Sequence, residues 1–131
     1  MKDKDFYSEK RPWGNYTLFA DNEQCSVKIL EVSGQLSLQS HNYREESWYV
    51  ISGKIEVLRG PVHEGLDVIK KNLETFNLSA GDNIFIPVKH VHTMKSTGEG
   101  SAFVLEVSKG EYKEDDIIRY ADKYGRNLKG E

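Results

Sequence analysis

A glutamine, a histidine and a glutamate stand at a spacing that could serve a metal ion. Gln39 and His41 are two residues apart on a predicted strand, so both side chains leave the same face of that strand. The residues after His41 are enough for a turn, which lets Glu46 on the next strand point into the same space, and Gly53 closes the hairpin. Imidazole, carboxylate and carboxamide groups in one place are suitable ligands for a divalent cation.

A second block of the chain supplies another histidine. Gly81 turns the chain, Pro87 bends it after a short strand, and His92 follows five residues later. We expect His92 to complete the ligand set. His90 is an alternative to Gln39, because His90 and His92 would share one face of a strand. We favour His92 alone, because His90 is expected in the loop just after Pro87.

The expected ligand set, Gln39, His41, Glu46 and His92, suits a borderline divalent ion. Two neutral imidazoles, one carboxylate and one carboxamide oxygen favour Zn²⁺, with Mn²⁺, Fe²⁺, Co²⁺ or Ni²⁺ as alternatives. Only one ligand is negatively charged, so the ion would be a strong Lewis acid, with open positions for water or substrate oxygens. His63 lies in a turn-rich segment and is expected at the surface.

Composition narrows the class of protein. The chain has 131 residues, which is the size of a single domain, and 37% of them are hydrophobic. Its net charge of −3 argues against a nucleic-acid partner. No apolar run is long enough to span a bilayer, and the first residues lack the apolar core of a signal peptide. The single cysteine excludes an internal disulfide. We expect a cytosolic protein without a membrane partner.

Short β-rich runs separated by turn signals predict an all-β sandwich or barrel. The expected strands are 16–19, 25–32, 36–41, 47–51, 54–58, 66–70, 74–78, 83–86, 91–95 and 102–107. The tail after Gly110 differs, because an acidic cluster precedes Ile117 and Ile118 and basic residues follow. This order predicts a short helix with balanced charges that packs back on the barrel.

The two blocks read Gly-x4-Gln-x-His-x4-Glu-x6-Gly and Gly-x5-Pro-x4-His, which resembles the two-part motif of the cupin superfamily. Gln39 stands where the first histidine of that motif is usual. More specifically, the chain is similar to the cupin domain of type II mannose-6-phosphate isomerases, often fused behind a mannose-1-phosphate guanylyltransferase. The matching stretches are Arg11–Gly14, Gly34–His41, Arg44–Trp48, Ile86–Pro87 with His92, Leu105–Val107 through Gly110, Glu114–Ile117, Arg119, Asp122 and Tyr124–Arg126.

The resemblance implies one cupin domain over residues 1–131, an all-β double-stranded β-helix of the jelly-roll type. Residues 1–10 are expected to form a flexible arm, and residues 110–131 a helical or irregular tail on the barrel. Because about ten residues precede Arg11, we expect the isomerase half alone, acting beside a separate guanylyltransferase in GDP-mannose and polysaccharide biosynthesis. A homodimer formed through exposed sheet edges is also expected.

The implied reaction interconverts mannose 6-phosphate and fructose 6-phosphate through a cis-enediolate. The metal would polarise the carbonyl, Arg44 would grip phosphate or the enediolate, and Glu106 or Glu45 would move the proton. Further substrate contacts are expected from Arg11, Trp13, Lys28, Lys109, Arg119 and Arg126. Trp13 and Trp48 are expected to be core and pocket-wall residues.

Two rival functions remain open at this stage. Lys89 and Ser96 stand where the family usually has glycine and asparagine, which is compatible with a non-catalytic module that binds a sugar phosphate or sugar nucleotide. Two histidines and one carboxylate can also form the triad of an Fe²⁺-dependent dioxygenase. The resemblance to phosphosugar isomerases argues against the dioxygenase.

Overall fold

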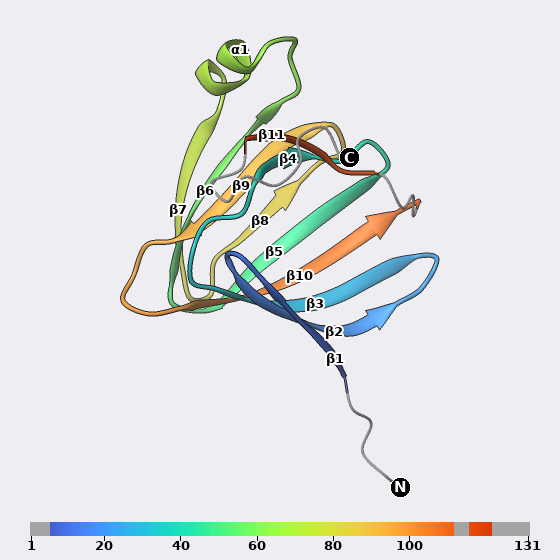
Figure 1. Cartoon of the computed structure of the whole chain (residues 1–131), viewed down its shortest axis with the longest axis vertical. Coiled ribbons are helices and arrows are strands. Elements are labelled where there is room, and N and C mark those ends of the chain that lie inside the picture. Colours follow the sequence, from blue (N-terminus) through green and yellow to red (C-terminus); the bar gives the residue numbers. More distant parts are fainter. Residues whose placement is uncertain (1–5, 112–115, 122–131) are drawn as a thin grey trace, which may run out of the picture.

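The computed structural model describes residues 6–111 and 116–121, which fold into two antiparallel sheets (Figure 1). The first sheet has the strand order β1-β2-β3-β10-β5-β8, and the second has the order β11-β4-β9-β6-β7. The strands of the first sheet are β1 (Tyr7–Arg11), β2 (Gly14–Asp21), β3 (Cys25–Val32), β5 (Arg44–Ser52), β8 (Asn83–Ile86) and β10 (Ala102–Gly110). Those of the second are β4 (Leu38–Ser40), β6 (Lys54–Pro61), β7 (Glu74–Ser79), β9 (His90–Ser96) and β11 (Ile118–Ala121).

Side chains alternate between buried and exposed along the central strands. On β5, Trp48 and Val50 are buried whereas Tyr49 and Ile51 are exposed. The same period of two runs along β10. The inward residues of both sheets form one core cluster of Trp13, Leu30, Val32, Leu36, Trp48, Val50, Ile55, Val57, Ile84, Ile86, Met94, Ala102 and Val104. The two sheets are therefore the layers of one barrel, as the sequence predicts.

One expected strand is a helix. Residues 66–70 were expected to be extended, but Leu66–Lys71 forms α1. Asp67 in the first turn and Lys70 in the last turn have the charges that a helix dipole favours at those ends. Ile69 is 1% exposed and joins a cluster of buried residues from the second sheet. A run of six residues with one buried side chain fits the two-residue period of a strand and the 3.6-residue period of a helix equally well, so the sequence pattern could not separate the two.

Both ends of the described chain contain strands that the sequence did not predict. The expected flexible arm is wrong for its last residues, because β1 pairs with β2 in the register Tyr7↔Leu18 to Arg11↔Gly14. The expected helical or irregular tail is a strand at residues 118–121, where β11 pairs with β4. The predicted strand over residues 36–41 is shortened to β4. Among the described residues, no helix is long and apolar enough to span a membrane.

Candidate metal centre

The inner face of the first sheet changes from apolar to polar along its strands. Cross-strand neighbours form rows, and in order along the sheet the rows are Val50–Val104–Leu30, Trp48–Glu106–Lys28 and Glu46–Ser108–Ser26. Arg44 of β5 lies opposite Gly110 in the next row. Because these residues recur every two positions, they all face the second sheet. The barrel therefore has a hydrophobic end and a polar end.

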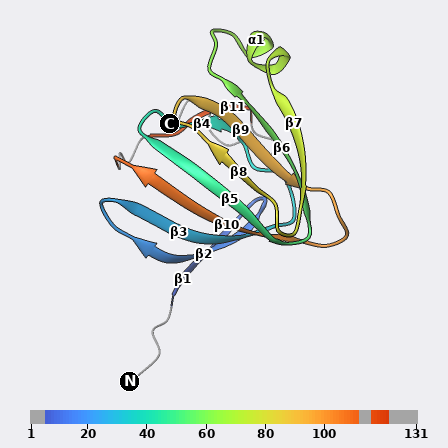
Figure 2. The ribbon, with the colours of Figure 1, turned by 180° about the vertical axis from the view of Figure 1, so that it is seen from behind.

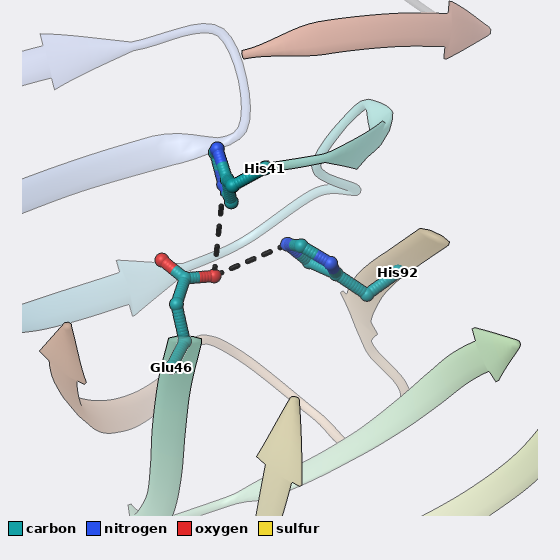
Figure 3. Close-up of side chains that lie close together, drawn as sticks. All are labelled: His41, Glu46 and His92. Atoms are coloured by element: carbon teal, nitrogen blue, oxygen red, sulfur yellow. Dashed lines mark ion pairs between the residues drawn. The ribbon is translucent and has the colours of Figure 1, made fainter. Parts of the chain in front are cut away.

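The second sheet brings its own polar residues to the same end. In the β4–β9 pair, Gln39 lies opposite His92, and in the β11–β4 pair it lies opposite Arg119. His41 follows directly after the last residue of β4. Three segments far apart in the sequence thus carry His41, Glu46 and His92 into one space, which Figure 3 shows.

His41, Glu46 and His92 converge on one buried point. The Nε2 atom of His92 is 3.1 Å from Oε1 of Glu46, and Nε2 of His41 is 3.8 Å from the same oxygen. The three residues are 3%, 4% and 1% exposed. Ligands that share one zinc ion at about 2.0–2.2 Å must lie within about 4.4 Å of each other. Both histidine–carboxylate distances satisfy this limit.

The backbone fixes the orientation of both imidazole rings. Nδ1 of His41 donates to the carbonyl oxygen of Asp116 at 2.5 Å, and Nδ1 of His92 donates to that of His90 at 3.0 Å. A carbonyl can only accept, so Nδ1 of each ring carries a proton, and in the neutral form of the ring Nε2 carries none. The lone pair of each Nε2 then points at Glu46. This is the arrangement in which histidine binds a metal.

The charges of the three grouped side chains favour the binding of a cation. Burial is the main cause that lowers the pKa of His41 to about 4, so its imidazole is neutral at pH 7. Burial opposes ionisation of Glu46, yet the pKa of its carboxyl group is well below the usual value, so Glu46 is a carboxylate. Among the described residues, Nε2 of His92 has no hydrogen-bond partner. A divalent ion would satisfy this lone pair and the carboxylate together, so the residues present fit a metal.

A second carboxyl group lies beside the first. Glu106 is 8% exposed, and burial raises its pKa to about 8, with the negative charge of Glu46 as the next cause. Oγ of Ser108 lies 3.2 Å from Oε2 of Glu46 and 3.3 Å from Oε1 of Glu106. Because one hydroxyl has one proton, Ser108 can donate to Glu46 and accept from protonated Glu106. Ser108 thereby links the two carboxyl groups.

Two cavities open at the polar end of the barrel. The metal cavity, of about 160 Å³, is lined by Gln39, His41, Glu46 and Glu106 together with Arg11, Trp13, Tyr16, Lys28, Leu30, Leu36, Ser37, Arg44, Trp48, Ile117 and Arg119. The second cavity, of about 240 Å³, shares Tyr16, Lys28 and Arg44 with it and adds Ser108, Lys109 and others. The two cavities are therefore neighbours, and the cationic side chains of Lys28 and Arg44 lie in the wall between them.

Several buried polar atoms around the metal cavity have no hydrogen-bond partner among the described residues. They include Oγ of Ser37, Nε of Arg44 and Nε1 of Trp48. The side chain of Arg44 forms no hydrogen bond or ion pair with another described residue, and the ammonium of Lys28 lies 4.8 Å from the centre of the Tyr16 ring. Most buried polar groups in proteins are satisfied, so a concentration of exceptions around one cavity points to a bound ligand.

Comparison with known proteins agrees with this geometry. The profile of the family described as mannose-6-phosphate isomerase C-terminal matches residues 2–122. The chain belongs to the mannose-6-phosphate isomerase C-terminal family.

Members of the family with curated names are similar along most of this chain. The xanthan biosynthesis protein XanB of Xanthomonas campestris is 36% identical over 119 residues, which is 88% of this chain and 23% of that protein. A mannose-1-phosphate guanylyltransferase of Salmonella montevideo is 33% identical over 120 residues, which is 89% of this chain and 23% of that protein. The chain therefore spans less than a quarter of the length of these relatives.

Solved structures identify the fold as a cupin. The capsular polysaccharide assembling protein CapF of Staphylococcus aureus superposes with a TM-score of 0.76 at 14% identity, over 92% of this chain and 34% of that chain. The cupin domain of Cnp3 of Schizosaccharomyces pombe gives a TM-score of 0.59 at 14% identity, over 73% of this chain and 65% of that chain.

The structure brings most of the expected site residues of this cupin together. The metal cavity is lined, together with His41 and Glu46, by Gln39, Arg44, Glu106, Arg11, Trp13, Lys28 and Arg119. Lys109 lines only the second cavity. Arg126 lies outside the described residues. Arg11 also forms a 3.1 Å ion pair with Glu9.

Three other expectations about the site can be compared with the structure. Glu45 alternates with Glu46 on β5 and lines neither cavity, so the suggestion that it moves the substrate proton is not supported by its position. His90 is the first residue of β9 rather than a loop residue, and it lies outside the ligand group. His63 is exposed, as expected.

Sequence reasoning did not identify Asp116 as a site residue. It is 6% exposed, and its carboxylate accepts from the backbone N–H groups of Asn42 and Tyr43 at 2.7 and 3.0 Å. The backbone carbonyl of Asp116 also accepts a hydrogen bond from Nδ1 of His41, so Asp116 fixes the turn that follows β4. Its place in the acidic cluster of the tail was the available signal, but the pattern suggested a solvated helix face.

Proposed function

We propose that this protein is a metal-dependent aldose–ketose isomerase that interconverts mannose 6-phosphate and fructose 6-phosphate through a cis-enediolate. The observation that carries the proposal is the buried group of His41, Glu46 and His92, whose free Nε2 lone pairs face one carboxylate. Membership of the isomerase family supplies the reaction class. Because the chain spans under a quarter of its curated relatives, the activity is a proposal for this chain.

His41, Glu46 and His92 would hold the ion. Gln39 is proposed as the fourth ligand, because it lines the same cavity and lies opposite His92. Two imidazoles with carboxylate and carboxamide oxygens suit Zn²⁺ best. When bound, such an ion supplies Lewis-acid polarisation of the substrate carbonyl.

Glu106 is proposed to move the proton between C1 and C2 of the sugar. It lines the metal cavity, and its raised pKa of about 8 lies near the pH at which a general acid–base group works best. Part of that rise comes from the negative charge of Glu46, which a bound cation would offset. Ser108 holds Glu106 and Glu46 in fixed relation and thereby sets where the proton is delivered.

Arg44 is proposed to stabilise the negative charge that develops on the enediolate oxygens or to grip the phosphate. Its guanidinium lies in the wall shared by both cavities, and no described carboxylate pairs with it. An arginine presents a planar fork of donors that suits two oxygens at once. Further phosphate contacts are proposed from Lys28 and Lys109 in the second cavity and from Arg11 and Arg119 in the metal cavity, with Trp13 as part of its wall. Arg126 stays a prediction.

The test is a coupled isomerase assay on metal-reconstituted protein. We expect turnover that disappears in His41→Ala and falls strongly in Arg44→Ala, while His63→Ala, an exposed histidine, keeps full activity. Equal turnover after exhaustive removal of metal would contradict the Lewis-acid role. Tight binding of the sugar phosphate without turnover would instead support a non-catalytic binding module.

The grouped histidines and carboxylate also match the ligand triad of Fe²⁺-dependent oxygenases. Oxygen uptake by the iron-loaded protein measures this alternative directly. A result with isomerase turnover and no oxygen uptake would exclude it. A separate guanylyltransferase stays the predicted functional partner, in keeping with the names of the relatives, and the cytosol stays the predicted compartment.

A further inference from the structure

The second cavity lies beside the metal centre on the inner face of the first sheet. Figure 2 shows β2, β3, β10 and β5 side by side in that order, and these strands supply most of the cavity wall. Ser108 of β10 and Ser26 of β3 share a cross-strand row with Glu46, and both line this cavity and not the metal cavity. Since neighbouring strands are about 4.8 Å apart, Ser108 and Ser26 lie about 5 and 10 Å from Glu46 along this row.

Two cationic side chains and one hydroxyl group face the second cavity. Lys28 and Ser26 are two residues apart on β3 and project from the same face, and Arg44 projects from that face of β5. The row of Ser26 lies between the rows of Lys28 and Arg44. Among the residues that the structure describes, the hydroxyl of Ser26 makes no hydrogen bond, and neither cation forms an ion pair. Unpartnered donors and positive charges in one wall suit an oxyanion with several oxygens.

Carboxylates are present at the exposed border of the same cavity. Asp21 of β2 and Glu111 after β10 line it, and both residues are exposed. Water and salt screen the charge of an exposed group, whereas the half-buried Lys28 and Arg44 are screened less. The inner part of the cavity is therefore positive, and an anionic group would bind there, beside Ser26.

A hexose phosphate has a suitable length to reach from the metal centre into the second cavity. In an acyclic hexose 6-phosphate, six bonds separate C2 from phosphorus, as many as in two residues of extended backbone, so the two atoms are at most about 7 Å apart. The interval from Ser108 to Ser26, about 5 to 10 Å from Glu46, contains this distance. In a triose 3-phosphate only three bonds separate these atoms, and a reach of about 3.5 Å is too short.

We propose that the second cavity is the phosphate subsite of the substrate and that Ser26 determines the selection for a phosphorylated sugar. Lys28 and Arg44 offset the negative charge of the phosphate, and the hydroxyl of Ser26 donates a hydrogen bond to one of its oxygens. The sugar chain crosses the wall shared by the two cavities, with C1 and C2 at the metal end. The inference rests on the proposed isomerase function for the identity of the sugar, but binding of the phosphate does not require turnover.

The probe for this subsite is mannitol 6-phosphate, an open-chain sugar phosphate that has no carbonyl group and cannot be isomerised. Isothermal titration calorimetry on the zinc-loaded full chain measures its dissociation constant. Ser26→Asp should raise this constant by about tenfold or more, because the new carboxylate repels the phosphate. Ser26→Ala should raise it by about three- to tenfold, because a hydrogen bond to a charged group is lost.

The matched control is Ser47→Asp, which places the same charge on the exposed outer face of the first sheet. It should change the dissociation constant by less than about twofold. Circular dichroism checks that each variant keeps its β-sheet content, and Ser26→Ala, which adds no charge, provides the test if Ser26→Asp does not fold. Zinc affinity should be the same in Ser26→Ala and the unaltered protein, since Ser26 is not among the proposed ligands.

Unchanged binding of mannitol 6-phosphate in both Ser26 variants would overturn the proposal. A loss in Arg119→Ala without a loss in Ser26→Asp would also overturn it, because Arg119 lines only the metal cavity. The isomerase function is judged separately. Weakened binding in Ser26→Asp together with no turnover in the unaltered protein would support the phosphate subsite and reject the isomerase. Turnover together with unchanged binding in Ser26→Asp would do the reverse.

Discussion

Nε2 of His92 lies 3.1 Å from Oε1 of Glu46, and both side chains are buried. In the neutral form of the His92 ring the proton is on Nδ1, held by the carbonyl of His90, and the lowered pKa of Glu46 leaves its carboxyl group ionised. Two electron-rich atoms at this distance in a buried place repel each other unless a positive charge lies between them. A cation bound between the two atoms would remove this repulsion.

Removing the negative charge of Glu46 should weaken metal binding most directly. Glu46→Gln keeps the shape of the side chain but loses the only charged ligand of the described group. Loss of a residue that only supports a ligand costs about 10–100-fold in affinity, so we expect a loss above about 100-fold here. Zinc titration calorimetry measures it, and Glu56→Gln on β6 is the control. Unchanged affinity in Glu46→Gln would show that the ion binds elsewhere.

Asp116 should be required for a well-formed site although it offers no proposed ligand. In Asp116→Ala the backbone N–H groups of Asn42 and Tyr43 lose their acceptor, which should lower the free energy of unfolding by about 1–3 kcal/mol. The turn that orients His41 would loosen, so zinc affinity should fall by about 10–100-fold. Denaturant unfolding and calorimetry measure the two effects. Glu99→Ala, at an exposed position between β9 and β10, should change neither.

Local alternation in the sequence was sufficient to predict the barrel, and the resemblance to the two-part cupin motif was sufficient to predict that His41, Glu46 and His92 lie together. Alternation marks the strands, and residue spacing within two blocks places His41, Glu46 and His92. The pairing of β11 with β4 could not be predicted, because it joins residues about 80 positions apart. The role of Asp116 depends on that pairing. The helix α1 was missed because its one buried residue, Ile69, shows no helical period by itself.

Lys89 should be replaceable by glycine with a gain in stability. Its φ of 58° is the only positive value among the described residues other than glycine. In this left-handed backbone conformation a residue with a Cβ atom is destabilised by about 1–2 kcal/mol relative to glycine. The greater conformational freedom of glycine in the unfolded chain offsets part of that difference. Lys89→Gly should therefore raise the free energy of unfolding by about 0.5 kcal/mol.

The backbone N–H of Lys89 donates to the carbonyl of His41 at 2.7 Å, and glycine keeps that bond. Lys89→Ala is the matched control, because it removes the charge and retains the Cβ atom. Denaturant unfolding should give a gain for glycine and none for alanine. Equal stability of the two variants would mean that the backbone conformation at this position carries no cost.

Glu106 should make the metal-free protein less stable as pH rises above neutrality. Its folded pKa of about 8 lies above the unfolded value of 4.5, so the folded state binds the extra proton. The stabilisation is complete below pH 4.5 and is lost as pH rises through 8. Between pH 6.5 and 8 the loss should be of the order of 2 kcal/mol. Chemical denaturation of the metal-free protein across this range measures it.

Glu106→Gln should flatten this part of the pH profile, because an amide has no proton to lose. The hydrogen-bond link through Ser108 can be kept by the amide group, so the variant should stay folded. A slope that is the same in both proteins would assign the titration to another group. It would also weaken the proposal that Glu106 serves as the acid–base group of the reaction.

Arg44 should affect turnover without affecting the metal. Arg44→Ala leaves all proposed ligands in place, so zinc affinity should stay within about threefold of the unaltered protein, whereas kcat/KM should fall about 100-fold or more. Arg44→Lys keeps the charge but loses the planar fork, so an intermediate loss is expected. A fall in kcat with constant KM would place Arg44 on the enediolate, because an interaction made only in the transition state changes kcat. A rise in KM alone would instead place Arg44 on the phosphate. The exposed residue Lys54 provides the control, because Lys54→Ala should keep wild-type kinetics. Wild-type kinetics in Arg44→Ala as well would show that Arg44 does not act in the site.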